Sequence, residues 1–283
     1  MSTPNSVMAP SREGSPVTPQ RPRLAAMLNK VPEVTLYFWV IKILCTTVGE
    51  TFADYLNDTL GLGLSKTTYI MGAALIIGLV FQFRLRKYLP GVYWLAVVLI
   101  SVVGTLITDN MVENWGISLP TSTAIFAVAL ACAFGAWYAS EKTLSIHTIV
   151  TRKREAFYWL TVLFTFALGT AAGDLTAEKL NVGYWKSALI FGGLIALVYG
   201  SHLKFKLNAI LAFWIAYILT RPLGASIGDY LSQKKADGGL GLGTTVTSMI
   251  FLFTILAVVV FLTITKRDRI ESNSARTDRL ETA

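Results

Sequence analysis

The sequence predicts an all-α integral membrane protein, with eight transmembrane helices built from four tandem two-helix repeats in parallel pseudo-symmetry. Two observations carry this prediction. Of the 283 residues, 53% are hydrophobic and only 15% are charged, and the mean hydropathy is +0.55. Apolar runs of about 20 residues can cross a bilayer as helices, which satisfy their own backbone polar groups. In addition, one pattern of Trp, Gly and Asp occurs four times along the chain.

In this pattern the Gly follows the Trp by ten residues, and the Asp follows the Gly by five. The copies are Trp39, Gly49 and Asp54; Trp94, Gly104 and Asp109; Trp159, Gly169 and Asp174; and Trp214, Gly224 and Asp229. All four copies run in the same direction through the membrane, which indicates a parallel repeat with its axis along the membrane normal. We therefore expect four equivalent helices, each with its Asp, around one central axis.

The spans follow in pairs, one pair per repeat. We expect them at about 34–56 and 67–83, 91–111 and 122–139, 156–175 and 187–200, and 207–231 and 244–265. The sixth is short, and the seventh is interrupted at Arg221-Pro222, because proline removes a backbone donor and kinks a helix. The repeats then occupy about 30–85, 86–142, 152–204 and 205–265. The Ser-, Pro- and Thr-rich residues 1–29 are expected to form a disordered cytoplasmic tail, and residues 266–283 a polar cytoplasmic tail.

The basic residues indicate the orientation of the chain. Eighteen of the 25 Lys and Arg residues lie in the two tails and in the connections after the second, fourth and sixth spans. The positive-inside rule makes this face cytoplasmic, so we expect both termini in the cytoplasm. Because the net charge of +8 is placed beside apolar runs, it indicates anchoring at a membrane and no nucleic-acid partner.

Four tandem units of two spans, each with a Trp early in its first span, resemble a family of bacterial integral membrane proteins. That family is a four-fold tandem repeat of unknown function, described only as a membrane-anchored protein. The stretches that carry the resemblance are KVPEVTLYFWVIKILCTTVGETFADYL, YWLAVVLISVVGTLITDN, REAFYWLTVLFTFALGTAAGDL and AFWIAYILTRPLGASIGDYL. The resemblance covers about residues 30–265. It implies eight spans and a bacterial inner membrane, but it brings no activity.

A stripe of oxygen-bearing side chains runs along each first helix, because residues four apart share a helix face. The four stripes are Glu50, Asp54 and Asp58; Thr105, Asp109 and Glu113; Thr170, Asp174 and Glu178; and Ala225, Asp229 and Gln233. Carboxylate and hydroxyl oxygens suit hard cations such as Mg²⁺, Mn²⁺ or Ca²⁺. We therefore predict a cation site formed by the four repeat aspartates and Glu50, with Thr46 and Thr108 as further hydroxyl groups.

The same residues also have a structural interpretation. The aspartates can be helix-end residues at the water boundary, while the four repeat glycines only allow helices to approach closely. The four repeat tryptophans can form an aromatic belt or pack between repeats.

Two cations fall within the spans. Arg221 is predicted to be a gate or counter-charge that pairs with Asp229 or Glu50, or else to bind carbonyls freed by Pro222. Lys42 is predicted to extend its amine to the cytoplasmic face, with a place in a proton path as the alternative.

The residues favour a secondary transporter of a hard divalent cation, Mn²⁺ or Mg²⁺ first, with export favoured over import. Its partners are then the bilayer and a metal ion or proton; the cation is the substrate, and no cofactor is expected. A structural or assembly protein and a proton-coupled organic solute carrier are the alternatives, and the oligomeric state stays open, a homo-oligomer included. We do not expect an enzyme, because the sequence lacks a serine-hydrolase elbow, a Walker A loop and an HExxH motif.

Overall fold

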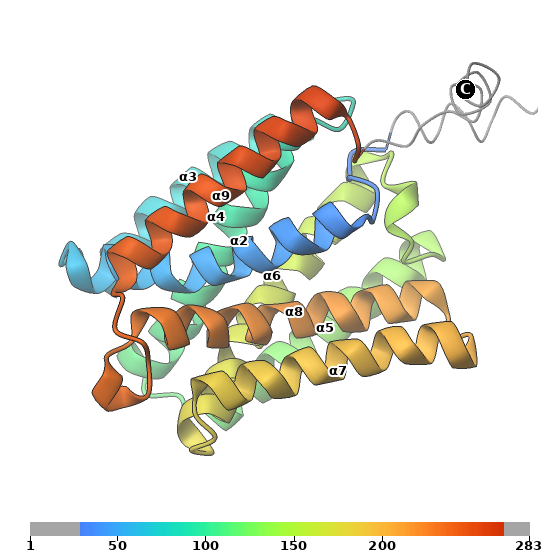
Figure 1. The fold of residues 1–283 in the computed structure, drawn as a ribbon. Coiled ribbons are helices and arrows are strands. Elements are labelled where there is room, and N and C mark those ends of the chain that lie inside the picture. The colour runs from blue at the N-terminus through green and yellow to red at the C-terminus, as the bar shows by residue number, and fades with distance from the viewer. Residues whose placement is uncertain (1–28, 269–283) are drawn as a thin grey trace, which may run out of the picture.

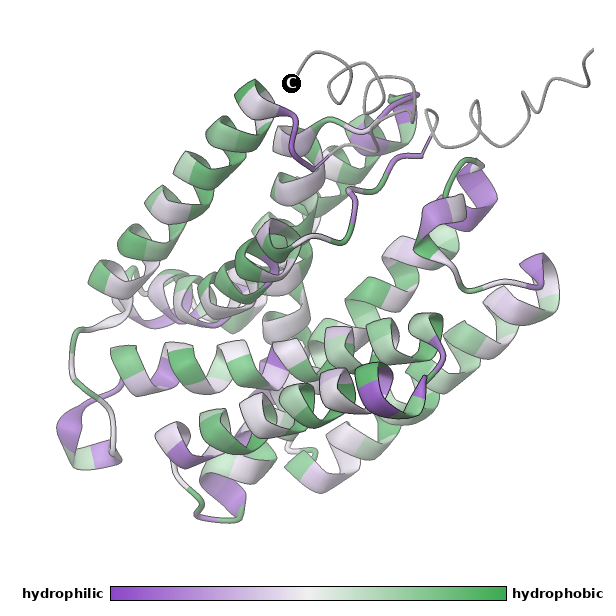
Figure 2. Ribbon diagram, turned by 45° about the vertical axis from the view of Figure 1, so that its right-hand side comes forward, coloured by the Kyte–Doolittle hydropathy of each residue, from purple (hydrophilic) through white to green (hydrophobic). Residues whose placement is uncertain are grey.

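The computed structural model describes residues 29–268, and within this range the chain is helical, without a strand. Eight of these helices are long and apolar enough to cross a membrane. They are α2 (Leu36–Asp54), α3 (Leu64–Arg84), α4 (Pro90–Asp109), α5 (Leu119–Glu141), α6 (Arg152–Asp174), α7 (Tyr184–Phe205), α8 (Ala209–Ser232) and α9 (Thr244–Thr265) (Figure 1). Figure 2 shows that hydrophobic residues dominate these helices, whereas hydrophilic residues gather in the connections.

Two expectations about the spans are wrong. The sixth span is not short: α7 has 22 residues, because Lys186 and Lys204 near its ends are tolerated within the helix. The seventh span is not interrupted, because α8 has 24 residues and continues through Pro222. Proline removes one donor, and the hydroxyl group of Thr46 on α2 donates to the carbonyl of Thr220, two residues before Pro222. The eighth span was expected at 244–265, and α9 has these bounds.

The helices form two layers. Each of α2, α4, α6 and α8 packs on the next, and α8 packs back on α2, so these four close an inner ring. The other four helices lie outside, and each packs mainly on the inner helix of the following repeat: α3 on α4, α5 on α6, α7 on α8, and α9 on α2. Figure 1 shows the last two of these contacts, with α7 along α8 and α9 beside α2. The inner spans are 50–67% buried and the outer spans 6–28%, so the inner ring holds the interior.

The repeat glycines are the points where the inner helices touch. A Cβ atom at any of them would overlap the next inner helix, at Ser101 for Gly49, Phe166 for Gly104, Arg221 for Gly169 and Thr46 for Gly224. In each case the contacted residue lies three positions before the Gly of its own repeat. Glycine permits this close approach because it has no side chain. The four contacts therefore occupy one register around the ring.

Three of the four repeat tryptophans pack inside the bundle, whereas Trp39 is only half-buried. Trp94, Trp159 and Trp214 are only 1–4% exposed, and Trp214 donates from Nε1 to the carbonyl of Leu144 at 2.9 Å. These three side chains therefore do not form an aromatic belt, because the neighbouring repeat covers them. An aromatic residue precedes each repeat Trp, and two of these, Tyr93 and Tyr158, share a hydrogen bond between their hydroxyl groups. We call this end of the bundle the tyrosine end.

The two ends of the described chain meet near the tyrosine end. Lys30 forms a buried ion pair with Glu155 at 2.6 Å, and Tyr88 donates a hydrogen bond to Asp268 at 2.5 Å. Asn29 and Asp268 were assigned to the polar tails, but both are buried. The packed part of the chain thus extends slightly beyond its predicted limits. The rest of the predicted tails, 1–28 and 269–283, lies outside the described residues.

Candidate functional site

A cavity of about 220 Å³ lies at the end of the inner ring opposite the tyrosine end. We call it the carboxylate cavity and this end the cavity end. Eight of its twelve lining residues carry carboxylates: Glu50, Asp54, Asp58, Asp109, Glu113, Asp174, Glu178 and Asp229. The other four are Asn57, Val112, Leu119 and Gln233. All four repeat aspartates therefore face one space.

The local structure of the inner helices places these aspartates at one level. Asp54, Asp109 and Asp174 are the last residues of α2, α4 and α6, and a five-residue π-helical turn follows each of them. Asp229 lies three residues before the end of α8. Glu50 is one turn deeper, and the exposed carboxylates of the π turns lie toward the mouth. The cavity thus has acidic groups at three levels.

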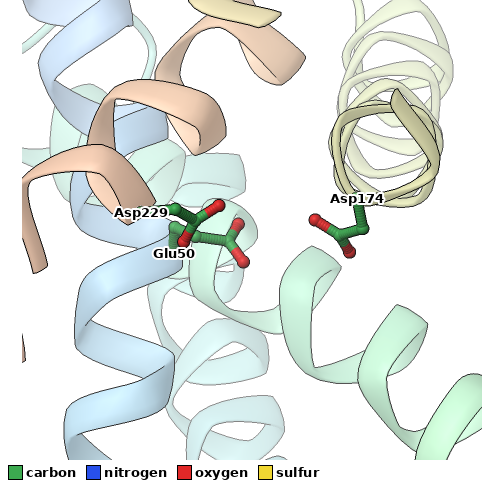
Figure 3. A group of neighbouring side chains, drawn as sticks. All are labelled: Glu50, Asp174 and Asp229. Atoms are coloured by element: carbon green, nitrogen blue, oxygen red, sulfur yellow. The ribbon is translucent and has the colours of Figure 1, made fainter. Parts of the chain in front are cut away.

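Three carboxylates come especially close together. One oxygen each from Glu50, Asp174 and Asp229 lies within 4.8 Å of the other two. In Figure 3, Glu50 and Asp229 lie side by side, and Asp174 points toward them from the opposite helix. Oxygen ligands lie about 2.0–2.6 Å from Mg²⁺ or Ca²⁺, so oxygens at this separation can share one such ion.

The repeat aspartates have no hydrogen-bond or ion-pair partner in the part of the chain that the structure describes. Among residues 29–268, their four carboxylates accept no hydrogen bond and form no ion pair. By contrast, Glu178 accepts a bond from Tyr184 and Asp58 one from Asn57. A carboxylate among apolar helices requires water, a proton or a cation when the protein offers no donor.

Arg221 lies behind Glu50, the innermost carboxylate that lines the cavity. Its side chain is fully buried and donates to Glu50 Oε2 at 2.9 Å. It also donates to the hydroxyl groups of Thr105 and Thr170 and to the carbonyl of Thr46 at 2.8 Å. One guanidinium group from α8 thereby joins the other three inner helices. Of the two carboxylates predicted to pair with Arg221, Glu50 does so and Asp229 does not. The carbonyl that Arg221 binds is that of Thr46 on α2, so it was not freed by Pro222.

A family model described as a repeat of unknown function (DUF347) matches residues 37–88, 92–143, 157–207 and 212–268. The chain belongs to this family. Each matched DUF347 repeat holds one inner helix, the outer helix that follows it, and one Trp, Gly and Asp of the pattern. No curated protein and no solved structure matches the chain.

Two predicted hydroxyl ligands of the DUF347 repeats do not reach the cavity. Thr46 donates to the carbonyls of Ile43 and Thr220, and Thr108 donates to those of Gly104 and Ala167. These bonds hold helices together. Thr105 and Thr170 contact Arg221 and do not line the carboxylate cavity.

Two placements differ from what the sequence indicated. Asn57 lines the cavity beside Asp58, because the π turn departs from the helical period of 3.6 residues on which the stripes were based. Lys42 does not extend to the cytoplasmic face. Its amine is buried 3.9 Å from the ring centroid of Phe166 and 4.2 Å from that of Tyr217. The reason is that α2 belongs to the inner ring, where this face of the helix meets other helices.

Proposed function

We propose that this chain is a secondary transporter of a hard divalent cation, with Mn²⁺ or Mg²⁺ favoured, in a bacterial inner membrane. The eight apolar helices form the spans, and the four repeats are related by an axis along the membrane normal. The basic connections lie on the cytoplasmic face together with both termini. The carboxylate cavity then opens to the outside.

The observation that carries this proposal is the convergence of four unpartnered aspartates on one cavity inside a bundle of membrane-length helices. Carboxylate groups so close together repel one another, so their gathering has to serve something that they bind. The lining contains no His, Cys or Met, and a set of oxygen ligands favours Mg²⁺, Mn²⁺ or Ca²⁺ over copper or zinc.

The cavity itself argues against the two alternatives. Pockets for organic molecules are typically about 300–1,000 Å³ and mainly apolar, whereas this one is about 220 Å³ and lined mostly by carboxylates. It therefore suits an ion better than an organic solute. A purely structural protein gains from the glycine contacts, but it gains nothing from four facing carboxylates without partners.

The mechanism follows from the position of Arg221. Counted inward from the cavity end, the groups that face the cation are the outer carboxylates, then the aspartate level, then Glu50. Glu50 exchanges its bond with Arg221 for a bond to the cation, which frees the guanidinium group. Further passage requires Arg221 to leave the axis, so the cavity is a binding site closed at its base. The driving force is an ion or proton gradient or the gradient of the cation itself. We favour export as the direction.

The test is cation flux in proteoliposomes, scanned over the divalent ions Mn²⁺, Mg²⁺, Ca²⁺ and Zn²⁺ and over monovalent Na⁺. Asp109→Asn and Asp174→Asn each remove one cavity carboxylate without changing side-chain volume, and both are expected to abolish flux. Asp237→Asn is the matched control, because Asp237 lies in the connection between α8 and α9 at the cavity end but does not line the cavity. Absence of flux for every ion from folded protein, or full flux in both cavity variants, overturns the proposal.

A further inference from the structure

Lys42 is a buried amine with no role in the mechanism above. Its side chain is 1% exposed, and among residues 29–268 its Nζ atom has no hydrogen-bond partner. The amine instead lies over two aromatic rings, those of Phe166 and Tyr217. Such rings stabilise an ammonium group electrostatically. A buried amine held in this way inside a transporter needs an explanation.

Lys42 is connected to the carboxylate cavity through Arg221. It precedes Glu50 by eight residues on the same face of α2, which places it about 12 Å nearer the tyrosine end. Arg221 Cζ lies 5.6 Å from the centroid of the same Phe166 ring that Lys42 covers. Two positive side chains thus share one aromatic ring, and Glu50 is the anion that pairs with one of them.

The titratable and charged groups around Lys42 are few. On α2 its neighbour is Cys45, and on α8 the neighbours are Tyr217 and Arg221. The facing part of α6 contributes the Phe166 ring, with Tyr158 further toward the tyrosine end. On α4 the titratable residues are Tyr93 and Asp109, at opposite ends of the helix, and α9 has no charged residue. Among residues 29–268, no carboxylate is therefore in contact with the amine.

We propose that cation binding in the carboxylate cavity releases a proton from Lys42 toward the tyrosine end, so that a bound divalent cation replaces a proton bound by the protein. This inference rests on the proposed function. When a cation takes Glu50, Arg221 loses its anionic partner, and its full charge acts on the nearby ammonium group across the Phe166 ring. Arg221 keeps its proton, because a guanidinium group does not deprotonate in proteins.

The proton transfer is balanced as follows. The ammonium group of Lys42 gives one proton to water at the tyrosine end and becomes a neutral amine, with no other bond broken. The hydroxyl groups of Tyr158 and Tyr93 are bonded to each other, and Tyr158 interacts with Tyr217, whose ring lies against the amine of Lys42. These hydroxyl groups lie toward the tyrosine end from Lys42 and suit a relay. When the cation leaves, Glu50 returns to Arg221 and the amine takes a proton back. Since linkage is reciprocal, protonation of Lys42 also promotes cation release.

The test measures how many protons are released for each Mn²⁺ bound by the full-length protein in detergent. Calorimetric titrations with MnCl₂ in two buffers of different ionisation enthalpy give this number. Lys42→Met removes the titrating amine, and Lys42→Arg keeps a cation that does not release its proton. Both variants should release about one proton fewer per Mn²⁺ than the unaltered chain while still binding it. Lys204→Met, at an exposed lysine on α7, is the control and should match the unaltered chain.

The outcomes separate the two proposals. If Mn²⁺ binds and whichever Lys42 variant folds releases as many protons as the unaltered chain, the exchange proposal is wrong and the cation site remains. If no divalent cation binds to the unaltered chain, both proposals fail. Loss of the extra proton with Mn²⁺ binding retained supports the exchange proposal.

Discussion

Removing one cavity carboxylate should stabilise the protein in the absence of divalent cations. We consider Asp229→Asn, because Asp229 is 6% exposed and one of its oxygens lies within 4.8 Å of one from Asp174 and one from Glu50. At 4.8 Å and an effective dielectric constant of about 20, two unit charges repel by about 3 kcal/mol. Glu50 is already paired with Arg221, so the main repulsion removed is that with Asp174.

Water in the cavity reduces this repulsion, which leaves an expected gain in unfolding free energy of about 1–2 kcal/mol. At about 2–4 °C per kcal/mol, the midpoint of thermal unfolding should rise by about 2–8 °C in a buffer with chelator. The unaltered chain should gain about 2.7 kcal/mol, or about 5–11 °C, from a divalent cation at a hundred times its Kd. Asp229→Asn should lose most of this second gain.

The assay is thermal unfolding in detergent, followed by intrinsic Trp fluorescence with chelator and with each divalent cation. Asp237→Asn is again the matched control and should behave like the unaltered chain under both conditions. The reasoning is refuted if Asp229→Asn melts below the unaltered chain in chelator, or if no divalent cation raises the midpoint of the unaltered chain.

Three further predictions follow from the same geometry. Arg221→Met should lower the unfolding free energy by about 3–5 kcal/mol, since it leaves Glu50 buried without its partner; denaturant titration should show partial recovery in the double variant with Glu50→Gln, and additive losses would contradict the pairing. Gly104→Ala should destabilise by about 1–3 kcal/mol, because the added Cβ would lie 2.7 Å from Phe166 Cβ. The control for Gly104→Ala is Gly173→Ala, because a Cβ at Gly173 would lie at an ordinary distance of 3.6 Å from its nearest neighbour. Equal melting temperatures of the two variants would count against the close contact at Gly104. Cation affinity measured by calorimetry should fall as the pH is lowered, because carboxylate ligands must be deprotonated to bind a metal; an affinity independent of pH between 5 and 8 would exclude a carboxylate site.

The sequence predicted the helices that form the inner ring because these helices carry the repeated Gly and Asp. It did not show that each outer helix packs on the inner helix of the following repeat. An outer helix such as α9 is apolar along most of its length, and such a helix can pack equally well on either neighbour. Pro222 was also misleading, because the cost of proline depends on whether a neighbouring helix supports it.

Most residues of the candidate site could be predicted from the sequence, because residues four apart on one helix share a face. The face of α2 that carries Glu50 and Asp54 continues back through Thr46 to Lys42. This periodicity places Lys42 on the face of α2 that points to the axis of the ring. The position of Lys42 near the start of the helix instead suggested that its amine reaches water. The pairing of Arg221 with Glu50 was not decidable from the sequence, because Asp229 lies only eight residues away on α8 whereas Glu50 lies on α2, 171 residues away. The choice depends on how α2 and α8 cross.

The most direct test of the cation site is a crystal structure of the full-length protein grown with Mn²⁺, with anomalous difference maps calculated from data near the manganese edge. We predict one strong peak inside the carboxylate cavity, bound by oxygens of Glu50, Asp174 and Asp229, and its loss in Asp174→Asn. A cavity without an anomalous peak at saturating Mn²⁺, or a peak that persists unchanged in that variant, would contradict the account.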